Sequence, residues 1–229
     1  MESIKYTLVR AKRRTVAVCI KDGEVIVKAP LKTPIYAIEN FLNQKAGWIA
    51  KKTEVSRARL ARYADVFACK AFLFLGKIFP YVVTPRKTPS IKDGALLVPQ
   101  LYVENGVPQK SDALVRGVRR VYKRAAAPIL QERLQTISQA IGLPYKGFSL
   151  SDAKTKWGSC DGNNAIKLNW RLILLDSALI DYVIVHELAH TVQHNHSNAF
   201  WALVGQHYPK YKEAVRWLKE CGVLCELYA

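Results

Sequence analysis

Two histidines and a glutamate stand at a spacing that can bind a metal ion and use it. His186, Glu187 and His190 form the pattern HExxH, and four of the five histidines of the chain lie within residues 186–196. Residues four apart share one face of a helix, so His186 and His190 can direct both imidazoles at one ion. Glu187 then faces a water bound to that ion. This spacing favours a zinc site in which Glu187 acts as a general base.

A catalytic zinc usually takes three protein ligands, and two later histidines compete for the third position. In an unbroken helix the Cα atom of His194 would lie about 12 Å along the axis from that of His186, which is too far. His196 follows Asn195, a residue that tolerates the left-handed conformation that ends helices. We therefore expect His196 to be the third ligand. The spacing equals that of the metzincins, but Gln193 replaces their glycine.

The segment before the motif predicts a buried helix that positions the first two histidines. Asp176 or Ser177 can cap its N-terminus, and apolar side chains surround the helix, among them Ile184, Val185 and Leu188. Histidines on a buried helix need partners, and a metal supplies them. The alternative, core histidines bonded to neighbouring carbonyls with Glu187 as a solvated charge, leaves the histidine clustering unexplained.

Composition predicts a globular protein of a reducing compartment. The 229 residues are half hydrophobic, and no run of eighteen apolar residues is present. The N-terminus lacks the apolar core of a signal peptide. Five widely spaced cysteines form no zinc-ribbon pattern. We expect a cytoplasmic location and no membrane partner.

The formal net charge of +17, from 35 basic and 18 acidic residues, indicates an affinity for anions. Basic residues cluster at 10–14, 51–62 and 116–124, and a solvated helix face explains much of the last two clusters. Weak contact with nucleic acid or nucleotides through this surface is the functional alternative.

The first hundred residues predict a strand-rich region with one long helix. Strands are expected at 6–10, 16–20 and 25–28, with Asp22-Gly23 as a hairpin turn, and further hairpins at 72–83 and 95–104. Thr33 as N-cap and Pro34 at the first helical position begin a helix that runs to about Arg62. Residues 105–112 are polar and turn-forming, so we place a subdomain at 1–108 and a catalytic domain at 109–229.

The second half predicts helices around a small sheet. A helix from residue 113 is kinked or restarted at Pro128 and stops at Gly142. Segments 148–150, 156–160 and 166–172 predict a short meander with a hairpin loop at 161–164. One face of the last strand is polar and could receive an extended peptide, with Trp157, Ser159 and Cys160 shaping the wall. After His196, Ser197 can cap a helix whose Phe200 and Trp201 pack behind the metal site.

Several motifs together are more specific than HExxH. They are Lys156-Trp157-Gly158-Ser159-Cys160, Asn169-Trp170-Arg171-Leu172, His186-Glu187-Leu188-Ala189-His190, Asn195-His196-Ser197 and Phe200-Trp201. Similar stretches occur earlier, at residues 13–15, 27–30, 45–49 and 75–76. In this combination the chain resembles the YgjP-like metallopeptidase family, which is allied to SprT-like and other zinc peptidases.

The resemblance implies an α+β fold: a zincin-like metallopeptidase domain with an active-site helix and a small antiparallel sheet, preceded by a strand-rich N-terminal subdomain. It also implies zinc bound by His186, His190 and His196, with Glu187 as the catalytic glutamate. A peptide or protein is then the expected substrate. His207, Tyr208 and Arg171 are candidates for a further donor to the reaction's oxyanion.

Two other functions use the same site. One is hydrolysis of nucleoside triphosphates or another phosphoanhydride, without a P-loop. The other is a nucleic-acid-associated protease. A purely structural zinc would be closed by four ligands, whereas the motif supplies three histidines and Glu187.

Overall fold

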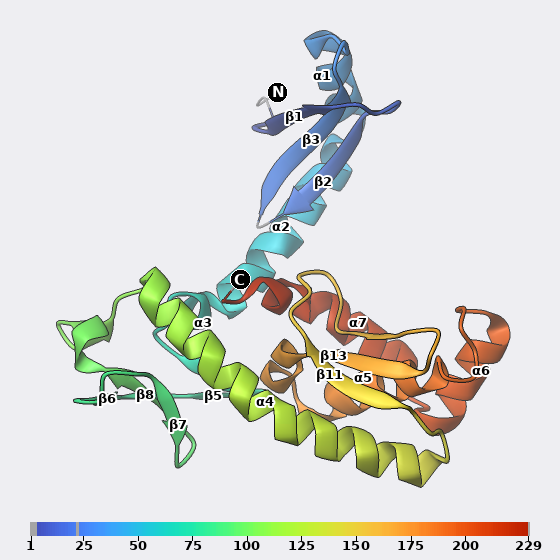
Figure 1. Ribbon diagram of the computed structural model, residues 1–229. Helices are drawn as coiled ribbons and strands as arrows, with labels where there is room; N and C mark the ends of the chain where they lie inside the picture. Colours follow the sequence, from blue (N-terminus) through green and yellow to red (C-terminus); the bar gives the residue numbers. More distant parts are fainter. Residues whose placement is uncertain (1–3, 22, 229) are drawn as a thin grey trace. The chain divides into compact units, whose positions relative to one another are not determined.

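The computed structural model describes residues 4–21 and 23–228, and the chain divides into two compact units between Ala64 and Asp65 (Figure 1). The first unit is a three-stranded sheet with two helices. The sheet has the order β1-β3-β2, with β1 parallel and β2 antiparallel to β3. Its elements are β1 (Thr7–Ala11), β2 (Ala17–Lys21), β3 (Glu24–Pro30), α1 (Ile35–Gln44) and α2 (Ala46–Arg62).

The core of the first unit follows from alternation along its central strand. Val25, Val27 and Ala29 of β3 are buried, and they pack with Ile38 and Leu42 of α1. The expected hairpin pairs β2 with β3, although Asp22 of its turn lies outside the described residues.

The single long helix expected to run to Arg62 is instead two helices. The backbone leaves the helical conformation at Lys45, with φ −109° and ψ 11°. The first helix also begins one residue later than predicted, with Pro34 at the N-cap and no side-chain cap bond from Thr33.

The second unit combines four small sheets with helices. Its elements up to the long helix are α3 (Ala64–Phe67), β4 (Phe72–Phe74), β5 (Lys77–Phe79), β6 (Tyr81–Thr84), β7 (Ser90–Lys92), β8 (Ala95–Pro99), η1 (Gln100–Tyr102), β9 (Val103–Glu104), β10 (Val107–Pro108) and α4 (Asp112–Ile141). The remainder are β11 (Gly147–Ser151), β12 (Gly158–Cys160), β13 (Ala165–Asn169), η2 (Trp170–Leu174), α5 (Ser177–Ala189), α6 (Asn198–His207), α7 (Tyr211–Glu220) and η3 (Cys221–Glu226). The predicted α+β class is confirmed.

Residues 65–108 belong to this second unit, which differs from the division expected after residue 108. The N–H of Leu75 donates to the carbonyl of Ile173 at 2.6 Å, and the Tyr122 hydroxyl of α4 donates to the carbonyl of Leu73 at 2.7 Å. The polar stretch at 105–112 contains the turn of the β9–β10 hairpin, where Asn105 and Gly106 have positive φ. The polar and turn-forming residues of this stretch reverse the chain within one unit. Their composition is the same as that of a linker between domains, which is why the sequence predicted a boundary there.

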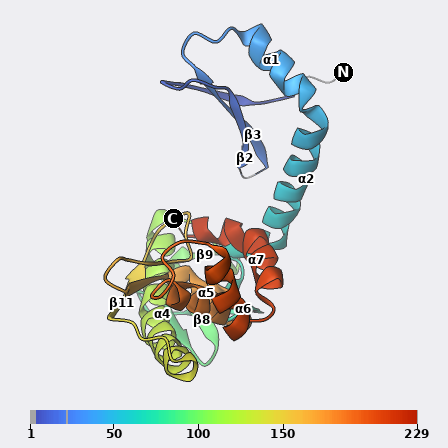
Figure 2. The same cartoon turned by 90° about the vertical axis from the view of Figure 1, so that its right-hand side faces the viewer.

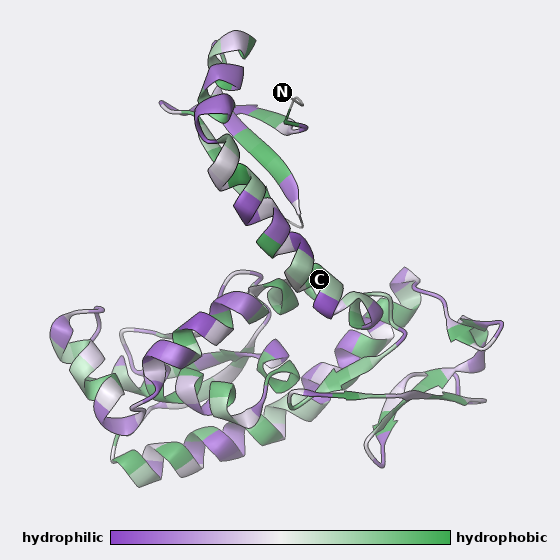
Figure 3. Ribbon diagram, turned by 180° about the vertical axis from the view of Figure 1, so that it is seen from behind, coloured by the Kyte–Doolittle hydropathy of each residue, from purple (hydrophilic) through white to green (hydrophobic). Residues whose placement is uncertain are grey.

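α4 is continuous across Pro128, so the predicted restart does not occur. Ser111 caps the helix by accepting a hydrogen bond from the N–H of Leu114, and Gly142 ends it in the left-handed conformation, as expected. Hydrophobic and hydrophilic residues alternate along it (Figure 3). One stripe is buried, with Val118, Leu130 and Leu134 among its members.

The sheet beside the active-site helix is mixed, because β11 pairs with β13 in parallel while β12 pairs with β13 antiparallel. The sequence predicted an antiparallel meander, and this prediction was wrong for the pairing of β11 with β13. The last strand also stops at Asn169, where the side-chain oxygen accepts the N–H of Arg171 and begins the 3-10 turn η2. α5 packs against this sheet, and α6 and α7 lie beside α5 (Figure 2).

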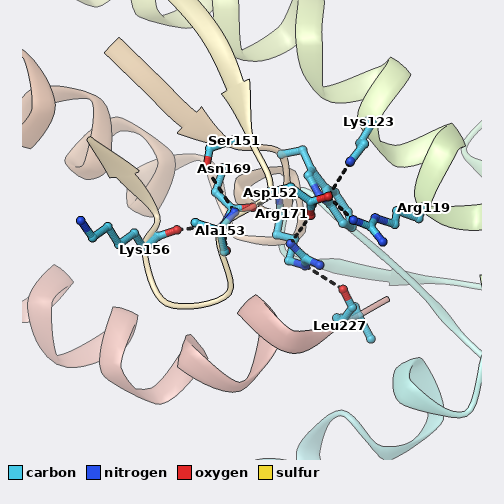
Figure 4. Close-up of polar contacts among 10 residues, drawn as sticks. Arg119, Lys123, Ser151, Asp152, Ala153, Lys156, Asn169, Arg171 and Leu227 are labelled. Atoms are coloured by element: carbon cyan, nitrogen blue, oxygen red, sulfur yellow. Dashed lines mark hydrogen bonds and ion pairs between the residues drawn. The ribbon is translucent and has the colours of Figure 1, made fainter. Parts of the chain in front are cut away.

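An ionic cluster around the buried Arg171 fixes the segment between β11 and β12 (Figure 4). The guanidinium of Arg171 is fully buried and donates to Asp152 at 2.9 Å and to the carbonyl of Leu227 at 2.7 Å. Arg119 and Lys123 of α4 also bind Asp152. Burial alone would raise the pKa of Asp152, but hydrogen bonds from Lys123 and other donors outweigh it and hold that pKa well below its usual value.

Asn169 holds the other end of the same segment. Its side-chain amide is buried and donates to the carbonyls of Ala153 and Lys156 at 2.7 and 2.8 Å. Its backbone N–H donates to the carbonyl of Trp157 at 2.8 Å. Asn169 and Arg171 therefore determine where the chain enters β12.

Replacing Asp152 by asparagine should destabilise the protein by about 3–5 kcal/mol, since it leaves the Arg171 charge buried without a counter-ion. The comparison is Asp181→Asn, which breaks an ion pair with Arg133 whose side chains are 31% and 36% exposed. Water can replace that partner, so we expect a loss of about 1 kcal/mol or less. Urea unfolding of the two variants measures both losses. Equal losses would contradict a special role for the buried Arg171.

Candidate metal centre

Three histidines from two segments converge in the second unit. The ligand atoms of His186, His190 and His196 all lie within 4.8 Å of one another, and the Nε2 atoms of His186 and His196 are 3.1 Å apart. Tetrahedral ligands at about 2.1 Å from a zinc ion lie about 3.4 Å apart, so one ion fits among the three imidazoles. His194 is exposed and lies outside this group.

The turn that brings His196 back differs from the predicted one. α5 ends at Ala189, and the N–H groups of Val192 and Gln193 both donate to the Ala189 carbonyl. Asn195 does not adopt a positive φ, so no left-handed residue is needed there. The helix ends before His194, which removes that residue from the helical face shared by His186 and His190.

The caps on both sides of this turn follow the sequence pattern. Asp176 accepts a hydrogen bond from the N–H of Leu179 at 3.0 Å at the start of α5. Ser197 accepts one from the N–H of Phe200 at 3.3 Å at the start of α6. Both predicted caps are confirmed: Asp176 sets where α5 begins, and Ser197 sets where the turn ends and α6 begins.

Each of the first two imidazoles has its second nitrogen engaged. His190 Nδ1–H donates to the carbonyl of Gln193 at 2.9 Å, which leaves Nε2 with the lone pair. The hydroxyl of Tyr182 lies 3.4 Å from Nδ1 of His186. Such partners on the far side of the ring orient metal-binding histidines.

Burial keeps the histidines in the form that binds metals. Burial, and to a smaller extent the neighbouring His190 and His196, lower the pKa of His186 to about 3. Burial also lowers the pKa of His190, against the opposing effect of its hydrogen bond to Gln193. Neutral imidazoles are the ligand form, so these rings need no deprotonation at pH 7.

Aromatic rings pack behind the histidines, as predicted for Phe200. The buried Phe200 ring lies 4.4 Å from the ring centre of His190, 4.9 Å from His186 and 4.8 Å from His196. Trp201 lies 5.8 Å from His186 and stacks on Tyr211 at 5.4 Å. These contacts fix the imidazole planes, and neither ring carries a group for the reaction.

The carboxylate of Glu187 is held against strand β12. The residue is 6% exposed, and its carboxylate accepts a hydrogen bond from the N–H of Cys160. A Cβ atom at Gly158 would lie only 2.6 Å from Glu187 Oε1 and 2.7 Å from Cγ. Only glycine fits at that position, which gives the sequence motif around Gly158 a physical reason that spacing alone did not reveal.

Burial raises the pKa of Glu187 to about 8, while the charge of Lys156 and the Cys160 N–H act in the opposite direction. A cation bound by the adjacent histidines would favour the ionised carboxylate. The ionised carboxylate is the form that can accept a proton from water.

Two of the three proposed oxyanion donors are engaged in other hydrogen bonds. Arg171 is committed to Asp152 and Leu227. The Tyr208 hydroxyl donates to the carbonyl of Ala178, near the start of α5. His207 ends α6 and is not part of the histidine group.

The strand predicted to receive a peptide is also the wrong one. β13 lies between β11 and β12, so both of its edges are occupied. β11 and β12 are the two edge strands, and β12 is the one that contacts Glu187. The sequence pattern of 166–172 located the sheet but not its strand order.

Comparison with known proteins agrees with the motif set. A family model of the YgjP-like metallopeptidase domain matches residues 14–221. Among solved structures, the chain is similar to the metallopeptidase zymogen abylysin of Pyrococcus abyssi, with 21% identity, 40% of this chain and 93% of that chain covered, and a TM-score of 0.36. The chain is also similar to the metallopeptidase zymogen jannalysin of Methanocaldococcus jannaschii, with 18% identity, 40% of this chain and 94% of that chain covered, and a TM-score of 0.36.

Among curated proteins, none matches this chain significantly. No helix of the described residues is long and apolar enough to cross a membrane. The family match spans most of the sequence and includes the histidine cluster and Glu187. The chain therefore belongs to the YgjP-like metallopeptidase family, a class of metal-dependent hydrolases.

Proposed function

We propose that this chain is a zinc peptidase in which His186, His190 and His196 hold the metal and Glu187 is the general base. The observation that carries the proposal is the convergence of three imidazoles beside one buried carboxylate. Imidazole nitrogens suit zinc, and three protein ligands leave a fourth position for water or substrate. Within the described parts of the chain, the histidine group contains no fourth ligand side chain.

The chemistry divides between the metal and the glutamate. When bound, zinc supplies a Lewis acid that polarises the scissile carbonyl and lowers the pKa of a coordinated water. Glu187 accepts the proton from the attacking water and returns it to the leaving amine. The Cys160 N–H holds the Glu187 carboxylate in one orientation, so the base needs little rearrangement before the reaction.

The outer edge of β12, where the Cys160 N–H already donates to Glu187, is the proposed peptide-binding edge. The backbone of Trp157 and Asp161 bonds to β13, so the alternation of an antiparallel pair directs the backbone groups of Gly158 away from β13. An extended substrate can add as a further strand there. This arrangement would lay the scissile bond alongside Glu187, which contacts the same glycine.

Glu187→Gln should retain one zinc ion and lose hydrolysis by about 10²- to 10⁴-fold, because the base is needed only when water loses its proton. Mass spectrometry measures bound metal. Turnover is measured on unfolded protein, short peptides and nucleoside triphosphates, with wild type alongside. Unchanged turnover would remove Glu187 from the mechanism. Glu187-dependent cleavage of triphosphates alone would replace the peptidase with a phosphoanhydride hydrolase.

Gly158→Ala should lower peptide hydrolysis by about 10²-fold while zinc binding persists, because the new methyl displaces the Glu187 carboxylate by an ångström or so. The matched control is Gly162→Ala in the turn of the same hairpin, where a Cβ atom meets nothing within 4 Å. Its activity should stay at the wild-type level. Full activity of Gly158→Ala would show that contact with β12 does not position the base.

A further inference from the structure

Basic residues in the N-terminal half of α4 fall into two groups with different surroundings. Arg119 and Lys123 pair with Asp152, a carboxylate that they share with Arg171. A second group lies on the solvent-exposed face, one helical turn apart, and consists of Arg116, Arg120 and Arg124. Among the side chains that the structure describes, no carboxylate forms an ion pair with any of these three arginines. Their charge is therefore available to a partner from outside the chain.

These arginines line one wall of a pocket of about 320 Å³, which we call the α4 pocket. The opposite wall is the segment Lys87–Pro89 together with Tyr102. The two walls are packed directly on one another, because a Cβ atom at Gly117 would lie 2.9 Å from Pro89 Cγ. This close approach brings the Lys87 segment beside the arginine row.

The charges of the α4 pocket are unbalanced. Its lining contains four basic side chains and no aspartate or glutamate: Lys87, Arg116, Arg120 and Arg124. Like charges one turn apart on a helix repel each other by a few tenths of a kcal/mol per pair. Asp112, one turn before Arg116, forms no ion pair with it among the described residues. An anion in the pocket would relieve this repulsion.

The linear arrangement favours a polymer of phosphates over a single small anion. Residues four apart on a helix are displaced by about 6 Å along its axis, so the guanidinium groups form a row that can meet successive phosphates. Arginine binds phosphate through two parallel hydrogen bonds. The half-buried Tyr102 adds an aromatic ring on which a base can stack.

We propose that the α4 pocket binds single-stranded nucleic acid, with the arginine row on the phosphates and Tyr102 against a base. Every lining residue belongs to the second unit, at the N-terminal half of α4 beside the β6–β8 sheet (Figure 1). No base-reading pattern is present, so binding is independent of sequence. This proposal does not rest on peptidase activity, since it uses none of the metal-site residues.

Fluorescence anisotropy of a labelled oligothymidylate with the full chain tests the arginine row. The triple variant Arg116→Gln, Arg120→Gln, Arg124→Gln should bind at least tenfold more weakly at about 50 mM salt, because three counterion-releasing contacts are lost. Each phosphate contact on a single strand contributes roughly 0.7 to the slope of log K against log salt. Losing three contacts should therefore make that slope less steep by about 2. Thermal unfolding of the variant should match wild type, because the three side chains are exposed.

The matched control removes the same charge from elsewhere on the second unit. Lys146→Gln, Lys210→Gln and Arg216→Gln are combined, and all three side chains are exposed. This control should retain wild-type affinity and salt slope. An equal loss in both triple variants would overturn the proposal, since the binding would then follow net charge alone. No binding by wild type at low salt would also overturn it.

Tyr102 distinguishes a single strand from other phosphate ligands. Tyr102→Phe should keep the affinity for oligothymidylate, and Tyr102→Ala should lose at least about fivefold. Duplex DNA, which hides its base faces, should bind more weakly than the single strand and should not respond to Tyr102→Ala. A nucleoside triphosphate that binds as tightly as the oligonucleotide, or an unaltered Tyr102→Ala, would overturn single-strand recognition.

Discussion

The burial of the Glu187 carboxylate constrains how closely strand β12 must approach helix α5. A carboxylate that is 6% exposed needs donors close by, and strand β12 supplies the Cys160 N–H. The strand must come so near that only a glycine fits at position 158. The approach of β12 is set in turn by Asn169, which bonds to the carbonyls of the preceding segment. Arg171 anchors the same segment through Asp152. Two buried polar residues thereby determine the position of the Glu187 carboxylate.

Local patterns predicted much of this arrangement from the sequence. Helix caps at Asp176 and Ser197 and the helix end at Gly142 depend on neighbouring residues only, so they were predictable. The strand order was not, because the parallel pairing of β11 with β13 joins segments separated by the whole of β12. Arg171 illustrates the same limit. Alternation assigned it to a polar face, whereas a 3-10 turn and a distant aspartate draw it fully into the core.

The turn before His196 differs from the one that the spacing argument assumed. Distance along a helix disfavoured His194, and the structure groups His196 with the other two. The turn, however, depends on an early end of α5 at Ala189 instead of a left-handed Asn195. The net charge of the sequence likewise did not show which basic residues are available to a partner. Some of the 35 basic residues serve the fold itself, as Arg10 does in binding the carbonyls of residues 30, 31 and 33. Only position in the fold separates those from the arginines of the α4 pocket.

X-ray absorption spectroscopy of the zinc-loaded protein tests the central claim most directly, because it reports the atoms bound to the metal. The account predicts one zinc with three imidazole nitrogens and one oxygen at about 2.0 Å. Sulfur at about 2.3 Å would contradict it by implicating a cysteine such as Cys160. Four imidazoles would contradict it as well, because His194 would then close the position that substrate and water require.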